Sequence, residues 1–148
     1  MLRCLIVEDD ELSRELLSLQ MEPYAQCDQA ENGLIGVEAF SSALQAGNPY
    51  DLILLDIVMP EMDGLEAAKA MRRYEEQQGI SIDKGVHIVV LSSLSTPQDV
   101  IQAYVAAQSA AHLVKPVQPE KLVKTLRKLD LIPDRKSTRL NSSHGYIS

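Results

Sequence analysis

Short apolar runs alternate with longer amphipathic segments along this chain, and this alternation limits the possible folds more than any other feature. The strongest runs are residues 2–7, 52–55 and 86–91, and weaker ones follow at 27–30 and 112–114. Nearly continuous apolar runs are typical of strands that are buried on both faces of a parallel sheet. Five rounds of strand and helix therefore predict an α/β fold with helices on both sides of the sheet.

Helical patterns fill the gaps between the runs, at residues 11–21, 34–46, 65–77, 97–108 and from 119 onward. In the first of these segments, Leu12, Leu16 and Leu19 recur at helical spacing. Because strand crossovers are right-handed, few topologies are possible, and the flavodoxin-like order 2-1-3-4-5 is one of the two common ones.

Polar residues follow four of the five predicted strands: Glu8, Asp9, Asp10, Asp56, Ser92 and Lys115. In the order 2-1-3-4-5 the first and third strands are neighbours, so the carboxylates of these two strands converge. Clustered carboxylates repel each other, and an oxygen-preferring cation such as Mg²⁺ relieves that repulsion. A lysine and a hydroxyl beside the cluster complete a phosphoryl-transfer site, with Asp56 as the nucleophile.

Each of these residues also has a structural explanation when it is taken alone. The acidic triplet 8–10 is typical of a solvated helix start, and Asp56 could cap a turn. Ser92 could bond its own backbone, and Lys115 could be a surface lysine. The functional interpretation depends on the combination, because each residue falls at the same end of a different strand.

Charge and cysteine content exclude several function classes. The net charge is -7, from 14 basic and 21 acidic residues, which disfavours direct contact with nucleic acid or an anionic membrane. No apolar run approaches the ~20 residues that span a bilayer. Cys4 and Cys27 have no metal-ligand spacing and are interpreted as small buried side chains in a reducing compartment. We therefore expect a cytoplasmic protein.

Four motifs together resemble one known family. They are LIVEDD at 5–10, DLILLDIVMPEMDG at 51–64, VLSS at 90–93 and LVKP at 113–116. Over residues 2–130 the chain resembles the receiver domain of bacterial two-component response regulators, in a stand-alone form like the chemotaxis regulators. The resemblance implies a flavodoxin-like (βα)5 three-layer sandwich with a parallel sheet of order 2-1-3-4-5.

The resemblance also implies roles for the residues around Asp56. Asp56 is the phosphoacceptor and receives its phosphoryl group from a sensor histidine kinase or a histidine-phosphotransfer protein. The cofactor Mg²⁺ is held by Asp9, Asp56 and the backbone carbonyl of Val58, with Glu8 acting through a water molecule. The chain then assists its own phosphorylation and dephosphorylation and is not a metabolic enzyme.

Further implied roles concern the response to phosphorylation. Ser92 and Lys115 bind the phosphoryl oxygens, and the bond between Lys115 and Pro116 is cis. His112 stands at the position of the aromatic switch residue, where the family has Tyr or Phe. The downstream protein target binds the face formed by the fourth helix (97–108), the fifth strand and the fifth helix.

Two departures from the family pattern carry expectations of their own. Gln108-Ser109-Ala110 replaces the usual glycine-containing turn before the last strand. Val58 and Leu94 stand two residues after Asp56 and Ser92, and their apolar side chains cannot orient an attacking water. We therefore expect slow self-dephosphorylation.

Several alternatives stay open. A Mg²⁺-dependent phosphohydrolase with an aspartate nucleophile uses the same residue types, although its usual general acid position holds Val58 here. Nucleotide or flavin binding fits the fold class, but no glycine-rich loop follows the first strand. The chain could also be the receiver fragment of a longer multidomain regulator.

We expect the receiver domain to span residues 1–133 and the tail 134–148 to be disordered. The tail resembles a cloning scar, with a genuine short tail as the alternative.

Overall fold

The sheet of this protein consists of five parallel strands in the order β2-β1-β3-β4-β5. The computed structural model describes residues 1–57, 59, 63–93, 105, 108 and 110–133. The strands are β1 (Leu2–Val7), β2 (Ala25–Ala30), β3 (Leu52–Asp56), β4 (His87–Ser92) and β5 (Ala111–Val114). The strand order and the α/β architecture predicted from the sequence are confirmed.

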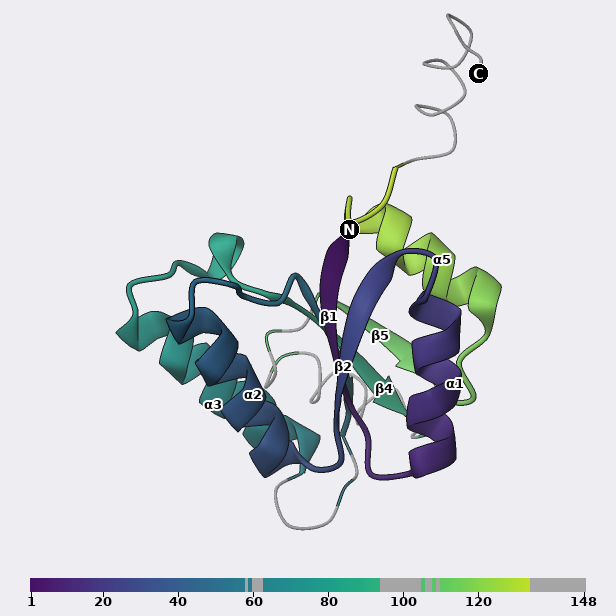
Figure 1. The fold of residues 1–148 in the computed structure, drawn as a ribbon, viewed down its shortest axis with the longest axis horizontal. Coiled ribbons are helices and arrows are strands. Elements are labelled where there is room, and N and C mark those ends of the chain that lie inside the picture. Colours follow the sequence, from purple (N-terminus) through teal and green to yellow (C-terminus); the bar gives the residue numbers. More distant parts are fainter. Residues whose placement is uncertain (58, 60–62, 94–104, 106–107, 109, 134–148) are drawn as a thin grey trace, which may run out of the picture.

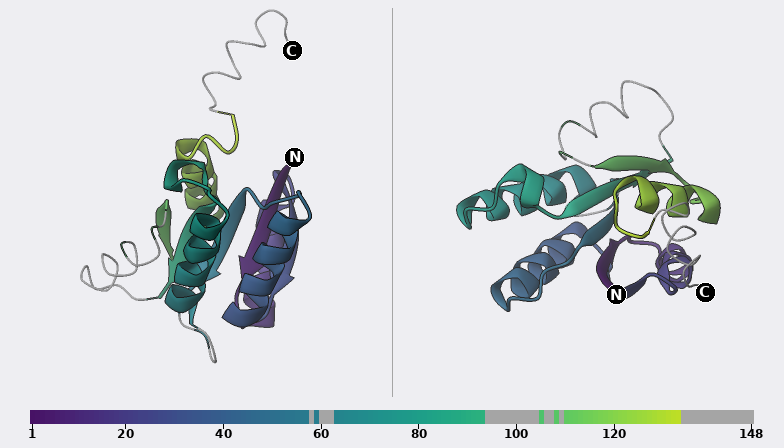
Figure 2. Two further views of the ribbon diagram at one scale, coloured as in Figure 1. Left: turned by 90° about the vertical axis from the view of Figure 1, so that its left-hand side faces the viewer. Right: turned by 90° about the horizontal axis from the view of Figure 1, so that it is seen from above.

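The described helices cover both faces of this sheet. They are α1 (Glu11–Met21), α2 (Gly33–Gln45), α3 (Gly64–Gln77), a short 3-10 helix (Ile82–Lys84) and α5 (Pro119–Lys128). Helices α1 and α5 lie on one face, and α2 and α3 lie on the other (Figures 1 and 2). Among the described residues, no helix has the length and apolar character needed to cross a bilayer.

The central strands bury side chains on both faces, as their apolar sequences predict. All five residues of β3 are buried. Leu52 and Leu54 pack in the cluster beneath α1 and α5, whereas Ile53 and Leu55 pack in the cluster beneath α2 and α3. This two-residue alternation follows from the pleat of a strand, and it leaves the end of β3 fixed between two packed layers.

Side-chain caps determine where three of the helices begin. Asp10, Asn32 and Asp63 each accept a hydrogen bond from the backbone N–H three residues later. A cap of this kind satisfies a donor that the first turn otherwise leaves unpaired. Consequently α2 and α3 start one residue earlier than the apolar pattern predicts, at glycines.

The leucines that identify α1 in the sequence do not face the core. Leu12, Leu16 and Leu19 are 68%, 50% and 63% exposed, and the buried positions of this helix are Leu17 and Met21. The three exposed residues follow one another at i, i+4 and i+7, so they form one apolar stripe along the helix. We call this set the α1 leucine stripe.

Most of the segment before β5 lies outside the described residues, as do the tail 134–148 and Val58. Gln108 is described and has a φ of 47°, a left-handed conformation that favours glycine. The carbonyl of Gln108 accepts a 2.9 Å hydrogen bond from Nη2 of Arg72. Nη1 of the same arginine forms an ion pair with the buried Glu75 carboxylate at 2.8 Å. Helix α3 thus anchors the turn in which the family's glycine is replaced.

Candidate functional site

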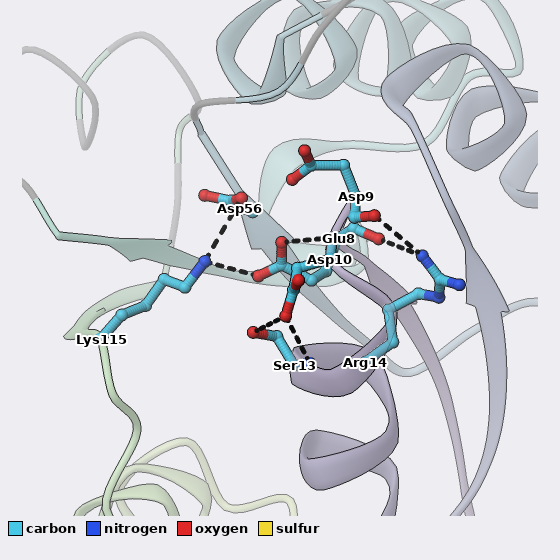
Figure 3. A network of polar contacts seen from close by, with 7 residues as sticks. All are labelled: Glu8, Asp9, Asp10, Ser13, Arg14, Asp56 and Lys115. Atoms are coloured by element: carbon cyan, nitrogen blue, oxygen red, sulfur yellow. Dashed lines mark hydrogen bonds and ion pairs between the residues drawn. The ribbon is translucent and has the colours of Figure 1, made fainter.

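Three carboxylates meet where β1 and β3 end. Glu8 and Asp9 follow β1, Asp56 is the last residue of β3, and the two strands pair directly in the sheet. One carboxylate oxygen from each residue lies within 4.8 Å of the others (Figure 3). Glu8 and Asp56 are buried, whereas Asp9 is exposed. The cluster therefore has two fixed carboxylates and one that is open to solvent.

Lys115, in the loop after β5, supplies the positive charge of this site. Its Nζ is 2.6 Å from Oε1 of Glu8 and 3.4 Å from Oδ2 of Asp56 (Figure 3). Burial alone would lower the pKa of Lys115, but the hydrogen bond to Glu8 and the charge of Asp56 outweigh it and leave the pKa raised. The amine is therefore protonated at neutral pH. The peptide bond that follows, between Lys115 and Pro116, is cis.

The exposed carboxyl group of Asp9 is affected by its acidic neighbour. Partial desolvation, together with the hydrogen bond and the negative charge of Glu8, raises the pKa of Asp9, and Lys115 opposes this only weakly. Like charges at short range disfavour the ionised form. A divalent cation between the three carboxylates would remove that repulsion, so the donor set fits a hard, oxygen-preferring ion.

The loop that carries Glu8 and Asp9 is held by the start of α1. Nη1 of Arg14 donates to the carbonyls of Glu8 at 2.9 Å and Asp9 at 3.3 Å (Figure 3). The backbone N–H of Asp10 donates to Oε2 of Glu8. Asp10 itself accepts from the backbone and hydroxyl of Ser13, which lowers its pKa. Asp10 is therefore the helix cap of the acidic triplet.

Arg14 contributes to the site without any signal in the sequence, because nothing in a single sequence shows which carbonyls a guanidinium reaches. Gly64 closes the motif at 51–64, but its contacts are visible only in the structure. A Cβ at Gly64 would lie 2.2 Å from the carbonyl oxygen of Asp56 and 2.6 Å from Cα of Ile57. The first turn of α3 thus packs directly on the backbone at Asp56, and only glycine permits this approach.

The remaining predicted residues lie at the same edge of the sheet or close to it. Ser92 ends β4 and is fully buried, and its carbonyl accepts a 3.0 Å hydrogen bond from the backbone N–H of Lys115. His112 lies in β5 opposite Val90 and is half-buried. Burial lowers the pKa of His112, and its buried Nε2 has no hydrogen-bond partner among the described residues.

Comparison with known proteins identifies the family. The model of the response regulator receiver domain matches residues 4–127. The chain belongs to this family. The receiver resembles the two-component response regulator ORR41 of Oryza sativa subsp. japonica, at 35% identity over 134 residues that cover 88% of this chain and 96% of that protein.

Solved structures of receivers have the same fold. The chemotaxis protein CheY4 of Vibrio cholerae is 29% identical, with a TM-score of 0.70, and the match covers 86% of this chain and 98% of that one. The receiver of the Saccharomyces cerevisiae regulator Ssk1, solved with the phosphotransfer protein Ypd1, is 27% identical with a TM-score of 0.75. That match covers 90% of this chain and 94% of the other. The protein is therefore a two-component signalling domain.

Removal of Lys115 is expected to destabilise this receiver. Lys115→Ala should lower the free energy of unfolding by about 1–3 kcal/mol in metal-free buffer, because two buried carboxylates lose their shared hydrogen-bonding counter-charge, which is itself partly exposed. Urea unfolding measures the change. Lys124→Ala, which truncates an exposed lysine of α5, should change the stability by less than about 0.5 kcal/mol. Equal stabilities for the two variants would contradict the interpretation of Lys115 as the counter-charge.

Proposed function

We propose that this receiver is switched by phosphorylation of Asp56, with Mg²⁺ bound beside it. The observation that carries the proposal is the convergence of Glu8, Asp9 and Asp56 within 4.8 Å, with the Lys115 ammonium 3.4 Å from Asp56. An aspartate between carboxylates and a fixed cation is the arrangement that phosphoryl transfer needs.

The chemistry follows from the positions of the side chains. A carboxylate oxygen of Asp56 attacks the phosphorus atom of a phosphohistidine, an O–P bond forms, and the N–P bond breaks. The departing imidazole nitrogen retains the electron pair of that bond and is protonated. Lys115 is placed to bind a phosphoryl oxygen, and Ser92, at the end of the neighbouring strand, is proposed as a second donor. The acyl phosphate adds negative charge at the strand ends.

The metal belongs to the same proposal. Glu8, Asp9 and Asp56 would hold Mg²⁺, with Glu8 acting through a water molecule, and the carbonyl of Val58 is proposed as a further ligand outside the described residues. When bound, Mg²⁺ supplies positive charge to the carboxylates and to the transferred phosphoryl group. The burial of Glu8 and Asp56 supports this assignment, because two buried carboxylates require compensation.

The proposal is tested by phosphorylating the protein chemically. Incubation with acetyl phosphate and Mg²⁺ should add one phosphoryl group, measured as about 80 Da by intact mass spectrometry. The same incubation with a metal chelator should leave the mass unchanged. Addition that needs no divalent ion would contradict the metal assignment. Sustained hydrolysis of small phosphate esters would favour the phosphohydrolase alternative instead.

A histidine kinase or a histidine-phosphotransfer protein is the proposed donor. The α1 leucine stripe supports this, because α1 begins directly after the acidic loop and exposes three leucines along one face of the helix. A cavity of about 90 Å³ is lined by Leu16 together with Lys115 and Pro116, so the stripe adjoins the site. An exposed apolar stripe beside a reactive group is a suitable docking surface for a partner helix.

The proposed output surface is the face that includes β5, α5 and the segment 97–108. Val114 on β5 is 54% exposed and Val105 is 69% exposed, so apolar side chains are available to a downstream protein. His112 is the proposed switch residue on this face. Its ring is half-buried, and Nε2 has no hydrogen-bond partner among the described residues, so no bond at this nitrogen holds the ring in its present position.

The lifetime of the acyl phosphate is expected to be long. Positions 58 and 94 lie outside the described residues, but valine and leucine have no polar atom with which to orient water. After removal of acetyl phosphate, the phosphorylated form should persist for minutes or longer, as measured by mass spectrometry over time. Loss within seconds without a phosphatase would contradict this expectation.

The proposal also covers the C-terminal end of the receiver and its cellular location. We place the end of the receiver at residue 133, and the packing of Leu131 and Ile132 against the cluster beneath α1 and α5 supports this limit. The tail 134–148 is proposed to be dispensable. A cytoplasmic location is proposed because two cysteines are too few for the disulfide scaffold that is typical of small secreted domains.

A further inference from the structure

The two cysteines of the chain are neighbours in the sheet, which the sequence did not indicate. Cys4 in β1 and Cys27 in β2 are direct partners in the parallel register. Both side chains lie on the same face of the sheet: Cys4 belongs to the cluster beneath α1 and α5, and Cys27 packs against that cluster. Both are free thiols. Neither has a role in the phosphorylation site, so the pair requires its own explanation.

The surroundings of the two thiols differ. Cys4 is fully buried, whereas Cys27 is partly accessible on the edge strand. The hydrogen bond between the two thiols, followed by burial, raises the pKa of Cys4. The same hydrogen bond lowers the pKa of Cys27, against the opposing effects of burial and the Asp28 carboxylate. Cys27 is therefore the more accessible of the two thiols, and the directions of the two shifts make it the more acidic one.

The strand geometry permits a covalent bond between the pair. Neighbouring strands lie about 4.8 Å apart. Disulfides join cysteines whose Cα atoms are about 4.4–6.8 Å apart, a range that includes this spacing, and whose Cβ atoms are about 3.5–4.5 Å apart, which is slightly less than it. A bond between Cys4 and Cys27 would therefore require rotation of the side chains and a small local approach of β2 to β1, with the strand order unchanged.

We propose that Cys27 and Cys4 form a peroxide-sensitive thiol pair, in which Cys27 reacts first and Cys4 closes an intramolecular disulfide. The Cys27 thiolate attacks one oxygen of hydrogen peroxide, the O–O bond breaks, and hydroxide leaves, so that Cys27 becomes a sulfenic acid. The Cys4 sulfur then attacks the sulfenic sulfur, and water leaves. Two electrons pass from the pair to peroxide, which is reduced to water. A dithiol reductant restores both thiols.

The disulfide would link the edge strand β2 to β1, the strand that leads into Glu8. Such a bond closes the chain between β1 and β2 and restricts the unfolded state more than the folded one. We therefore expect the oxidised protein to unfold several degrees higher than the reduced protein. This inference does not depend on the phosphorylation of Asp56 and can be tested without it.

The test uses the full chain, treated with hydrogen peroxide and then blocked with an alkylating reagent. Intact mass spectrometry should show a loss of about 2 Da, which corresponds to two hydrogens, and no alkylation. Trypsin cleaves after Arg3, Arg14 and Lys69, so the bond should join peptide 4–14 to peptide 15–69. Reduction should separate the two peptides.

Single variants assign the order of the two steps. In Cys4→Ala, Cys27 should accumulate as a sulfenic acid that dimedone traps. In Cys27→Ala, oxidation of the remaining Cys4 should be about tenfold slower or more, because Cys4 is buried and protonated. Equal oxidation rates in the two variants would contradict the assigned order. A peroxide-treated full chain that has only intermolecular disulfides, or two unmodified thiols, would overturn the proposal itself.

Discussion

Asp56→Asn is expected to take up no phosphoryl group under conditions in which the unchanged protein gains one. The amide has almost the same shape as the carboxylate, but its neutral oxygen is a poor nucleophile. Because Asp56 lies beside the buried Glu8, removal of its charge also relieves repulsion. We therefore expect the variant to be at least as stable as the unchanged protein in metal-free buffer, so that lost phosphorylation is not confused with unfolding.

Asp51→Asn provides the matched control. Asp51 immediately precedes the same strand at its opposite end and is exposed, so the two substitutions make the same chemical change in different places. This control should gain one phosphoryl group at the rate of the unchanged protein, as measured by intact mass spectrometry. Phosphorylation of Asp56→Asn at a comparable rate would show that another residue is the acceptor.

The fold could be predicted from the sequence because its central strands are buried on both faces. Runs such as 52–55 have no polar position that could face water, which leaves a helix-covered parallel sheet as the simple solution. The edge strand β2 was harder to identify. Its sequence, AQCDQA, is half polar, and as an edge strand it pairs with only one neighbour, so the prediction included only its last four residues, 27–30.

The orientation of α1 could not be predicted from periodicity. The α1 leucine stripe recurs at helical spacing, and so do the buried residues Leu17 and Met21. Periodicity alone does not determine which of the two sets faces the sheet. The strand ends, by contrast, specified the candidate site, because parallel strands bring their carboxyl ends to one edge. The contacts of Arg14 and Gly64 depend on three-dimensional packing. Arg14 belongs to none of the four motifs, and Gly64 closes the motif at 51–64 without indicating what packs against it.

Leu16→Glu is expected to slow phosphotransfer from a phosphohistidine protein by about tenfold to a hundredfold, with little effect on a small donor. Leu16 is the middle residue of the α1 leucine stripe, and a charge there would be buried unpaired against an apolar partner. Acetyl phosphate needs no docking surface, so its rate of transfer to Asp56 should be unchanged. The substitution lies on an exposed helix position and should alter stability by less than about 0.5 kcal/mol.

The measurement compares the two donors on the same protein samples. To find the protein donor, a panel of phosphorylated histidine-phosphotransfer proteins is tested on the unchanged chain. The one that phosphorylates the chain fastest is used. Ile82→Glu is the control, because Ile82 is 58% exposed in the 3-10 helix before β4, at the opposite end of the sheet from Asp56. Ile82→Glu should accept from both donors at normal rates. If Leu16→Glu slows both donors equally, the substitution disturbs the site itself. If it slows neither donor, the stripe is not the docking surface.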